Sequence, residues 1–315
     1  MNHFIKLADL PDFNQTLSLA KDLKTNPSKL NSLGKGKTLG MLFFNPSLRT
    51  RLSTQKAAHN LGLNTMVMNF SQESWALEFE DGTKMIGLRS EHVREAAAVI
   101  SQYCDFIAIR AFASLSDKEK DESEIVIRSF AKYARVPIIN MESATAHPLQ
   151  ALADAITLNE FKTPHKPKVA LTWAPHPKAL PHAVGNSFTK MMVNLDADFL
   201  IAHPKGYALN PEITKGVKCV TNQEEALEGA DFVYAKNWCS YQNYGQILRD
   251  DDKWMITAKK MELTNNAKFM HCLPIRRNIV ATDDVLDNSN SLVIQQSQNR
   301  IYSAQAVLKL LIENG

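Results

Sequence analysis

The sequence predicts an α/β protein with two domains, each built on a doubly wound parallel sheet. Short apolar runs alternate with helical patterns along the chain, which is typical of parallel strands joined by helices. The 315 residues exceed the size at which one hydrophobic core usually stops growing, about 250–300 residues. No long linker or low-complexity tract interrupts the alternation. These observations together favour two sheets rather than one.

Strands are expected where an apolar run is too short to form a helix. The expected strands are 38–44, 64–70, 105–110, 136–140, 168–173, 198–203, 217–220, 231–236 and 268–273.

Helices are expected between these strands. Segment 48–62 suits a helix that ends at Gly62, because glycine readily adopts the left-handed conformation that closes many helices. Segment 90–103 suits another helix. Pro148 fits the first turn of a helix whose next residues are apolar on one face. The last helix has one apolar stripe, formed by Ala304, Val307, Leu308 and Leu311.

Composition excludes several classes of function. The 44% hydrophobic share is enough for a packed interior, and the net charge of +3 gives no reason to expect a nucleic acid or an acidic membrane as partner. The four cysteines lack metal-ligand or disulfide-framework spacing. The N-terminus lacks the apolar core of a signal peptide, and no run approaches the ~20 residues that span a bilayer. We therefore expect a soluble cytoplasmic protein whose cysteines are reduced thiols.

Polar and basic residues follow the expected strands. The stretches NPSLRTR, ESATAHPLQ, APHPKALP, KNW and LPIRRN each come after an apolar run, and Arg110 ends another. Ligands of open parallel sheets bind at the carboxyl ends of the strands, so we expect a site there, between the two domains. Neither GxGxxG after a strand nor GxxxxGK[ST] is present, so no motif supports a nucleotide cofactor.

The stretch SLRTR predicts an anion site. Ser47 can cap the following helix, whose first N–H groups and dipole attract an oxyanion, and Arg49 adds a fork of donors that suits phosphate. Alone, the stretch also fits an ordinary capped helix with solvent-facing arginines. The histidine of HPLQ, His147, is alone more often structural, and Cys272 of HCLP is alone more often a small buried apolar residue.

Taken together and in this order, Ser-x-Arg-Thr-Arg, His-Pro-x-Gln and His-Cys-Leu-Pro resemble the motifs of the aspartate/ornithine carbamoyltransferase family over essentially the whole chain. The resemblance implies a carbamoyl phosphate-binding domain, 1–143, joined by a C-terminal helix, 298–315, that packs back on it. It implies a second domain, 144–297, that binds the amine acceptor. It further implies a homotrimer with active sites shared between subunits and no metal or organic cofactor.

The resemblance also assigns roles in the reaction, in which a neutral amine attacks carbamoyl phosphate and phosphate leaves. Arg110, His147 and Thr50 are the expected catalytic residues, because they would stabilise the carbonyl oxyanion. Gln150 and the backbone carbonyls of 272–273 would accept hydrogen bonds from the carbamoyl NH2. The expected carbamoyl phosphate-binding residues are Ser47, Leu48 (through its backbone), Arg49, Thr50, Trp75, Arg110, His147, Gln150, Cys272, Leu273 and Arg300.

Two differences from other members of the family narrow the choice of acceptor substrate. Segment 231–238 lacks the Ser-Met-Gly of ornithine carbamoyltransferases, and segment 71–82 has Trp75 where aspartate carbamoyltransferases have a lysine-bearing loop. At both places the sequence resembles the N-acylornithine subgroup, in which a tryptophan of the adjacent subunit reaches the phosphate. In that subgroup a loop like APHPKALP is associated with a knotted second domain. Without this resemblance, Trp75 would be taken for a core or interface aromatic residue.

The resemblance places Glu142 and Lys236 at the ornithine portion of the substrate. His176 and Arg276 would lie near its acyl or carboxylate end. Without the resemblance, Lys236 and Arg276 would pass for solvated surface charges.

Two positions of the sequence bear on which acyl group the substrate carries. Ser90 stands where acetyl-specific members have a glutamate and succinyl-specific members a proline, and Val280 stands where acetyl-specific members have a lysine. A glutamate would repel the free carboxylate of a succinyl group, whereas serine removes that charge. We therefore expect N-succinyl-L-ornithine as the acceptor, in arginine biosynthesis, with N-acetyl-L-ornithine as the alternative.

Two other functions remain open from the sequence. A non-catalytic module that binds a phosphate ligand would use SLRTR but would leave His147, Gln150 and 272–273 without a role. A carbamoyltransferase acting on putrescine or an oxamate-like acceptor is disfavoured by the charged residues expected around the acceptor.

Overall fold

The computed structural model describes residues 1–162, 165–248 and 252–314. The chain divides into two compact units. Unit 1 comprises Met1–Ser114, Glu119–Leu152 and the chain from Arg300 onward; unit 2 comprises Leu115–Lys118 and Ala153–Asn299. The expected ligand-binding domains, with boundaries after 143 and 297, stay a prediction, because compactness does not identify a ligand. The expected range 298–315 ends on Gly315, which lies outside the described residues.

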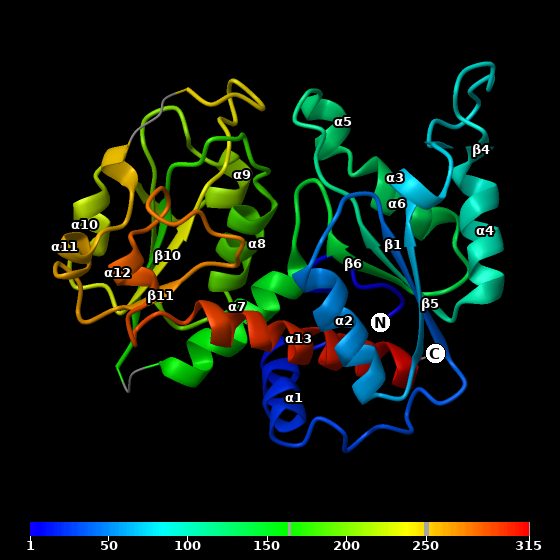
Figure 1. The fold of residues 1–315 in the computed structure, drawn as a ribbon, viewed down its shortest axis with the longest axis horizontal. Helices are drawn as coiled ribbons and strands as arrows, with labels where there is room; N and C mark the ends of the chain where they lie inside the picture. Colours follow the sequence, from blue (N-terminus) through cyan, green and yellow to red (C-terminus); the bar gives the residue numbers. More distant parts are fainter. Residues whose placement is uncertain (163–164, 249–251, 315) are drawn as a thin grey trace. The chain divides into compact units, whose positions relative to one another are not determined.

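Unit 1 is organised around a parallel sheet with the strand order β2-β1-β5-β6 (Figure 1). Its strands are β1 (Thr38–Phe43), β2 (Asn64–Asn69), β5 (Phe106–Arg110) and β6 (Ile138–Glu142). Residues of β1, β5 and β6 are buried almost without interruption, as expected for strands covered on both faces. The four strands predicted for this part of the chain are confirmed.

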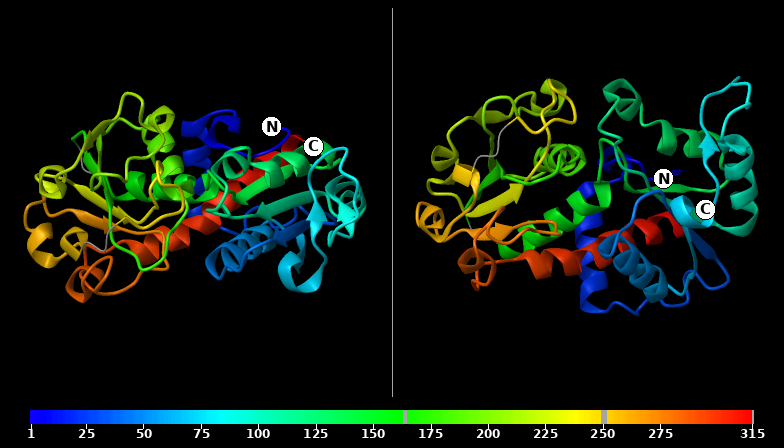
Figure 2. Two further views of the ribbon diagram at one scale, coloured as in Figure 1. Left: turned by 90° about the horizontal axis from the view of Figure 1, so that it is seen from above. Right: turned by 45° about the horizontal axis from the view of Figure 1, so that its top comes forward.

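Helices lie on both sides of this sheet. The helical segments are η1 (Leu7–Asp9), α1 (Phe13–Thr25), α2 (Arg49–Asn60), α3 (Phe70–Glu73), α4 (Val93–Tyr103), α5 (Lys118–Glu122) and α6 (Ile125–Tyr133). Val93 of α4 and Phe130 of α6 are buried against Ile107 of the sheet. The α2 helix lies on the opposite side of the sheet from α6 (Figure 2), as right-handed crossovers require when the strand order reverses. Unit 1 is therefore doubly wound.

Gly62 ends α2 as the sequence predicts. Its φ of +79° is left-handed, and a Cβ atom there would lie 2.0 Å from the carbonyl oxygen of Asn31. Both the conformation and the close approach require glycine.

The C-terminal helix α13 (Val293–Asn314) packs on unit 1. Its predicted apolar stripe is buried. Gln305 accepts a hydrogen bond from Asn60 Nδ2 of α2 at 3.0 Å and donates to the carbonyl oxygen of Pro27 at 2.8 Å. Ser303 Oγ donates to the carbonyl oxygen of Leu149 at 2.6 Å. The packing of this helix on the first unit is thus confirmed.

Unit 2 contains a second parallel sheet, with the strand order β11-β10-β7-β8-β9. Its strands are β7 (Lys168–Trp173), β8 (Asp198–Ala202), β9 (Lys218–Val220), β10 (Phe232–Lys236) and β11 (Lys268–Met270). Its helical segments are α7 (Pro148–Phe161, which begins in unit 1), α8 (Ala183–Met192), α9 (Pro211–Thr214), α10 (Gln223–Leu227), η2 (Asp252–Trp254), α11 (Ala258–Met261) and α12 (Asp283–Leu286). The expected strands are again present.

The segment before α4 differs from the prediction. A helix was expected over 90–103, but α4 begins only at Val93. Residues Glu91–His92 form the short strand β4, which pairs in parallel with β3 (Leu77–Glu78). His92 Nδ1 accepts a hydrogen bond from the Arg94 N–H at 3.1 Å, and this contact caps the helix.

Candidate active site

Two strand ends meet where the strand order of unit 1 reverses. Phe43 at the end of β1 and Arg110 at the end of β5 are partners in register. The loop 44–48 leaves β1 at this edge, and the Arg110 side chain starts from it. Reversal points of open parallel sheets are the usual place for a ligand. The structure thus brings the SLRTR stretch and Arg110 to the same edge.

The start of α2 offers a set of donors to this edge. Ser47 Oγ accepts a hydrogen bond from the Thr50 N–H at 3.2 Å, so the predicted cap is present, although the helix itself begins only at Arg49. The remaining N–H groups of the first turn and the positive end of the helix dipole attract anions. A polar cavity of about 280 Å³ lies beside the loop, lined by residues that include Asn45, Ser47 and the exposed Leu48. Arg49, Thr50 and Arg110 are not among its lining residues.

Buried polar side chains form a continuous hydrogen-bonded chain behind α2. In order along the contacts they are Gln150, Arg300, Thr50, Arg110, Glu142 and His147. Each of these residues is at most 7% exposed.

Thr50 is the centre of this chain. Its Oγ1 accepts a hydrogen bond from Arg300 Nη2 at 2.6 Å and another from Arg110 Nη1 at 3.1 Å. A hydroxyl group has two acceptor positions and one proton. Because both acceptor positions are occupied by arginines, the proton remains to be donated to a ligand oxygen.

The outer contacts of the chain fix the neighbouring groups. Arg300 Nη1 donates to Gln150 Oε1 at 3.0 Å. At the other end, the Glu142 carboxylate pairs with Arg110 and lies 3.3 Å from His147 Nε2. The sequence linked Glu142 only to the acceptor; its pairing with Arg110 follows from β6 lying beside β5, where the two residues are partners in register.

This buried chain contains two guanidinium groups, those of Arg110 and Arg300, which are always protonated. Arg110 pairs with the Glu142 carboxylate. Arg110 Nε is buried without a hydrogen-bond partner among the described residues. Because an unsatisfied buried donor is costly, this nitrogen is suited to donate to an oxygen of a ligand.

A second group of predicted residues lies together in unit 2. Trp173 and Lys236, which end β7 and β10, are partners in register where the order of this sheet reverses. Lys236 is buried and donates to the Asn237 carbonyl oxygen at 3.0 Å, so the alternative of a solvated charge is wrong for Lys236. Arg276 Nε donates to His176 Nε2 at 3.3 Å. The expected acceptor residues of this unit are thus neighbours.

The environment of His176 keeps it neutral. Burial lowers its pKa most, a hydrogen bond to the Lys178 carbonyl raises it, and the positive charges of Lys236 and Arg276 lower it further. His176 Nδ1 lies 2.9 Å from that carbonyl oxygen and 3.1 Å from the Lys178 backbone nitrogen, and Nε2 accepts from Arg276. The cationic groups of this cluster suit a carboxylate.

The segment after β11 also belongs to unit 2. Cys272 is buried, and Leu273 has a φ of +54°. Bulky residues rarely adopt this left-handed conformation, and such residues often occur at functional sites. Val280, in the same unit, is 1% exposed and part of the core.

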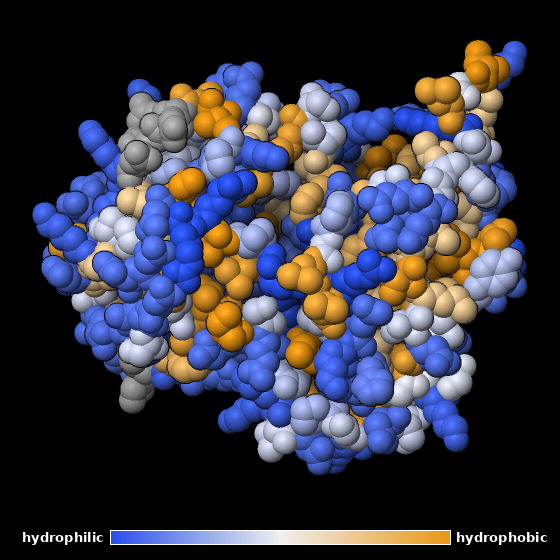
Figure 3. Space-filling model, viewed as in Figure 1, coloured by the Kyte–Doolittle hydropathy of each residue, from blue (hydrophilic) through white to orange (hydrophobic). Residues whose placement is uncertain are grey.

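Trp75 and Ser90 lie on a segment of unit 1, 71–92, that projects from the sheet (Figure 1). Trp75 is 55% exposed, so the alternative of a core aromatic residue is wrong. Its Nε1 donates to Glu91 Oε2 at 2.8 Å. Apolar residues at the tip of the segment are exposed to solvent (Figure 3); Ile86 is 83% and Leu88 is 99% exposed. The hydrogen bonds described for Trp75 and Ser90 stay within this segment.

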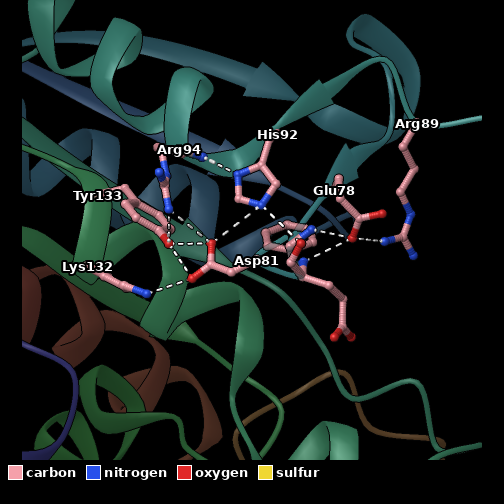
Figure 4. A network of polar contacts seen from close by, with 9 residues as sticks. Glu78, Asp81, Arg89, His92, Arg94, Lys132 and Tyr133 are labelled. Carbon is pink, nitrogen blue, oxygen red and sulfur yellow. Dashed lines mark hydrogen bonds and ion pairs between the residues drawn. The ribbon is translucent and has the colours of Figure 1, made fainter. Parts of the chain in front are cut away.

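A cluster around Asp81 anchors the projecting segment (Figure 4). The Asp81 carboxylate accepts hydrogen bonds from Lys132 Nζ at 2.7 Å and from the Tyr133 hydroxyl at 2.5 Å, both on α6. Arg94 of α4 lies 3.5 Å away. The hydrogen bonds from Lys132 and Tyr133 lower the pKa of Asp81 to about 2. The carboxylate is therefore ionised at neutral pH and ties the segment to two helices.

Two further findings bear on the kind of site. No helix in the described ranges is long and apolar enough to cross a membrane. Among the same residues, no group of three or more histidine, cysteine or acidic side chains is arranged to hold a metal ion.

Comparison with known proteins identifies the family. Residues 2–160 match the carbamoyl-P binding domain of aspartate/ornithine carbamoyltransferases, and residues 181–311 match their Asp/Orn binding domain. An N-succinylornithine carbamoyltransferase of Bacteroides thetaiotaomicron is 49% identical over 99% of both chains. An N-acetylornithine carbamoyltransferase of Xanthomonas campestris pv. campestris is 37% identical over 99% of this chain and 98% of its own length.

A solved structure is similar over the whole chain. It is a glutamate-to-serine variant of an N-acetyl-L-ornithine transcarbamylase complexed with carbamyl phosphate and N-succinyl-L-norvaline. It has a TM-score of 0.93 and 36% identity, and the match covers 99% of this chain and 100% of that chain. With both family domains matched and close relatives aligned from end to end, this chain belongs to the aspartate/ornithine carbamoyltransferase family.

Proposed function

We propose that this protein transfers the carbamoyl group of carbamoyl phosphate to the side-chain amine of N-succinyl-L-ornithine. The products are N-succinyl-L-citrulline and phosphate, in a step of arginine biosynthesis. The observation that carries the proposal is the buried chain in which Arg300 and Arg110 both donate hydrogen bonds to Thr50, at the anion-attracting start of α2. The 49% identity to an N-succinylornithine carbamoyltransferase supports the choice of acceptor.

In the proposed reaction, the neutral amine of the acceptor attacks the carbamoyl carbon. A carbon–nitrogen bond forms, the carbonyl oxygen becomes an oxyanion, and the bond from carbon to the phosphate oxygen then breaks. The amine proton passes to the departing phosphate. Preorganised donors that face the developing oxyanion lower the barrier most, and Arg110, Thr50 and His147 have this role. No metal or organic cofactor takes part.

The ligand contacts divide between two chemical tasks. Ser47, the Leu48 backbone and Arg49 hold the phosphate, since N–H groups and a guanidinium fork suit its oxygens. Arg300 holds Thr50 and Gln150 in place. Gln150 and the backbone carbonyls of 272–273 accept hydrogen bonds from the carbamoyl NH2.

The acceptor contacts follow the charges of the substrate. Lys236, His176 and Arg276 bind its carboxylate and acyl oxygens, since this cluster is cationic. Glu142 faces the ornithine amine. Ser90 selects the succinyl group, a choice supported by the glutamate-to-serine variant of the acetyl enzyme that was solved with N-succinyl-L-norvaline.

We further propose that the protein is a homotrimer in which segment 71–92 completes the site of an adjacent subunit. The exposure of Trp75 and of the apolar tip supports this arrangement. Trp75→Ala and His147→Ala, each inactive alone, should regain activity when their subunits are mixed, because some sites then contain both residues. No recovery after verified subunit exchange would contradict a shared site.

We also propose that unit 2 is knotted at the loop 174–181. The loop is bound near both ends to the segment after β10: the Asn237 side chain donates to the Ala174 carbonyl at 2.7 Å, and the Cys239 N–H donates to the Leu180 carbonyl at 2.9 Å.

One assay tests the proposed function. Wild-type protein is incubated with carbamoyl phosphate and, in parallel, ornithine, N-acetyl-L-ornithine and N-succinyl-L-ornithine, and the citrulline-type product is measured. The highest kcat/KM is expected with the succinyl substrate. A preference for the acetyl substrate would overturn the acyl assignment, and no product with any acceptor would leave only a phosphate-binding module.

A further inference from the structure

A line of side chains in unit 2 reaches the segment 271–273 from two helices. Gln296 of α13 donates from Nε2 to Asp154 Oδ1 of α7 at 2.7 Å. Its Oε1 accepts from the His271 N–H at 2.9 Å, and His271 Nδ1 in turn accepts from the Leu273 N–H at 2.9 Å. Asp154 and Gln296 are both fully buried. The backbone after β11 is thus connected to two helices through one carboxamide.

The two ends of that carboxamide cannot be exchanged. A flipped Gln296 would point its NH2 group at the His271 N–H, donor against donor. It would point its oxygen at the Asp154 carboxylate, acceptor against acceptor. The Asp154 carboxylate therefore fixes the orientation of the Gln296 carboxamide, and Gln296 in turn fixes the position of the His271 N–H. Holding this backbone matters because Leu273 has a φ of +54°, which an unsupported leucine rarely adopts.

The neighbouring tyrosine shows how closely this region is packed. Burial, together with the nearby Asp154 and Cys272, raises the pKa of Tyr234, whose ring lies within the core. Asp154 and Cys272 are therefore both near the Tyr234 hydroxyl.

We infer that Asp154 and Gln296 are positioning residues for carbamoyl phosphate, because they set the direction of the backbone carbonyls of Cys272 and Leu273. The inference rests on the proposed function, in which those carbonyls accept hydrogen bonds from the carbamoyl NH2. Neither side chain touches the substrate. Their effect is to make the site prefer a ligand that carries an NH2 group over one that does not.

A matched control lies about one turn further along α13. Asn299 Nδ2 donates to Thr157 Oγ1 and to Glu160 Oε2, both at 2.9 Å and both on α7. Asn299 is fully buried, like Gln296, and ties the same two helices together. Replacing either residue removes a buried link between α7 and α13, but only Gln296 also holds the His271 N–H.

The test compares two ligands that differ at the group in question. Acetyl phosphate has a methyl group where carbamoyl phosphate has NH2, so a change in the ratio of their dissociation constants between wild type and variant reports the NH2 contacts. In Gln296→Met, we expect the preference for carbamoyl phosphate to fall roughly tenfold, the usual range for lost buried hydrogen bonds, with little change for acetyl phosphate. Asn299→Leu should keep the wild-type ratio even though its Tm falls. Asp154→Asn, which keeps an acceptor for Gln296, should retain most of the preference.

Several outcomes would overturn the inference. An unchanged ratio in Gln296→Met, or an equal loss for both ligands, would mean that Gln296 has only a structural role. If that variant does not fold, Gln296→Asn keeps a carboxamide but is too short to reach both Asp154 and the His271 N–H, and an unchanged ratio there would be equally decisive. The proposed function fails separately: a wild type that binds both phosphates equally would remove the NH2 acceptors themselves, whereas a wrong acylornithine would leave this binding test intact.

Discussion

The two units reverse their strand order in the same way but present different chemistry at the reversal. In unit 1, α2 begins six residues after β1 ends, at Arg49, so a helix N-terminus and two buried arginines meet at one edge. In unit 2, β7 is followed by the loop 174–182 before α8 begins, and the edge presents Lys236, His176 and Arg276 instead. Unit 1 thus presents the start of a helix soon after its central strand, whereas unit 2 presents side chains of a loop and of strand ends.

The difference shows how one topology makes two kinds of anion site. A helix N-terminus with guanidinium forks and a hydroxyl group suits a phosphate, which has several oxygens to satisfy. Side-chain cations around a neutral histidine suit the carboxylate of an amino-acid derivative. Substitutions among the donors at the start of α2 should therefore affect carbamoyl phosphate, and substitutions of Lys236, His176 or Arg276 should affect the acylornithine.

The largest effect is expected for Arg49→Ala in unit 1. Loss of a charge-assisted contact to phosphate costs roughly 1.5–3 kcal/mol, which is about ten- to a hundredfold in kcat/KM for carbamoyl phosphate. The melting curve should stay normal. Lys56→Ala, at an exposed position of the same helix, serves as the control and should behave like wild type. Wild-type kcat/KM in Arg49→Ala would mean that the anion site is wrongly placed.

A smaller and selective effect is expected for Arg276→Gln in unit 2. The KM for N-succinyl-L-ornithine should rise about tenfold, as for one lost charged hydrogen bond, with carbamoyl phosphate affinity unchanged. The neighbouring Arg277 pairs with Asp283 and Asp287, so Arg277→Gln is the matched control and should leave both constants near wild type. Weaker binding of carbamoyl phosphate in Arg276→Gln, with an unchanged KM for N-succinyl-L-ornithine, would contradict this difference between the units.

Ser90→Glu should shift the choice of acyl group. Two carboxylates ~4 Å apart repel by about 4 kcal/mol at a near-surface effective dielectric, and solvent reduces this; even ~1.4 kcal/mol is tenfold. Activity with the succinyl substrate should fall relative to the acetyl substrate. Ser90→Ala, which adds no charge, separates repulsion from the loss of the hydroxyl. If kcat/KM for the two substrates keeps its ratio in Ser90→Glu, Ser90 is not the selector.

The smallest effect is expected for Asp81→Asn. The pKa of Asp81 is lowered to about 2 in the folded protein, so its contribution to stability is present above the ordinary value of 3.8 and is lost as the pH falls from there toward 2. The variant should have a slightly lower Tm than wild type at pH 7, and the difference should shrink below about pH 4. Asp196→Asn, at an exposed carboxylate with one long contact to Lys166, should change Tm less. A Tm difference that grows toward low pH would contradict the anchor.

The sequence predicts the main strands and helices because their apolar periodicity is local. It does not predict β3 and β4, since two-residue strands in a polar segment have no alternation to detect. The link from Glu142 to Arg110 depends on β6 lying next to β5, and strand order is not contained in periodicity. The Asp154–Gln296 bond joins residues 142 positions apart whose side chains look like ordinary polar positions of two helices. Contacts of this kind follow from packing rather than from local pattern.

The most direct test of the account is a crystal structure of the wild-type protein with carbamoyl phosphate. The account predicts the phosphate group at the start of α2, against Ser47, Arg49 and Thr50, with the carbamoyl oxygen beside Arg110. A phosphate group bound instead among His176, Lys236 and Arg276 would contradict the assignment of phosphate to unit 1 and carboxylate to unit 2.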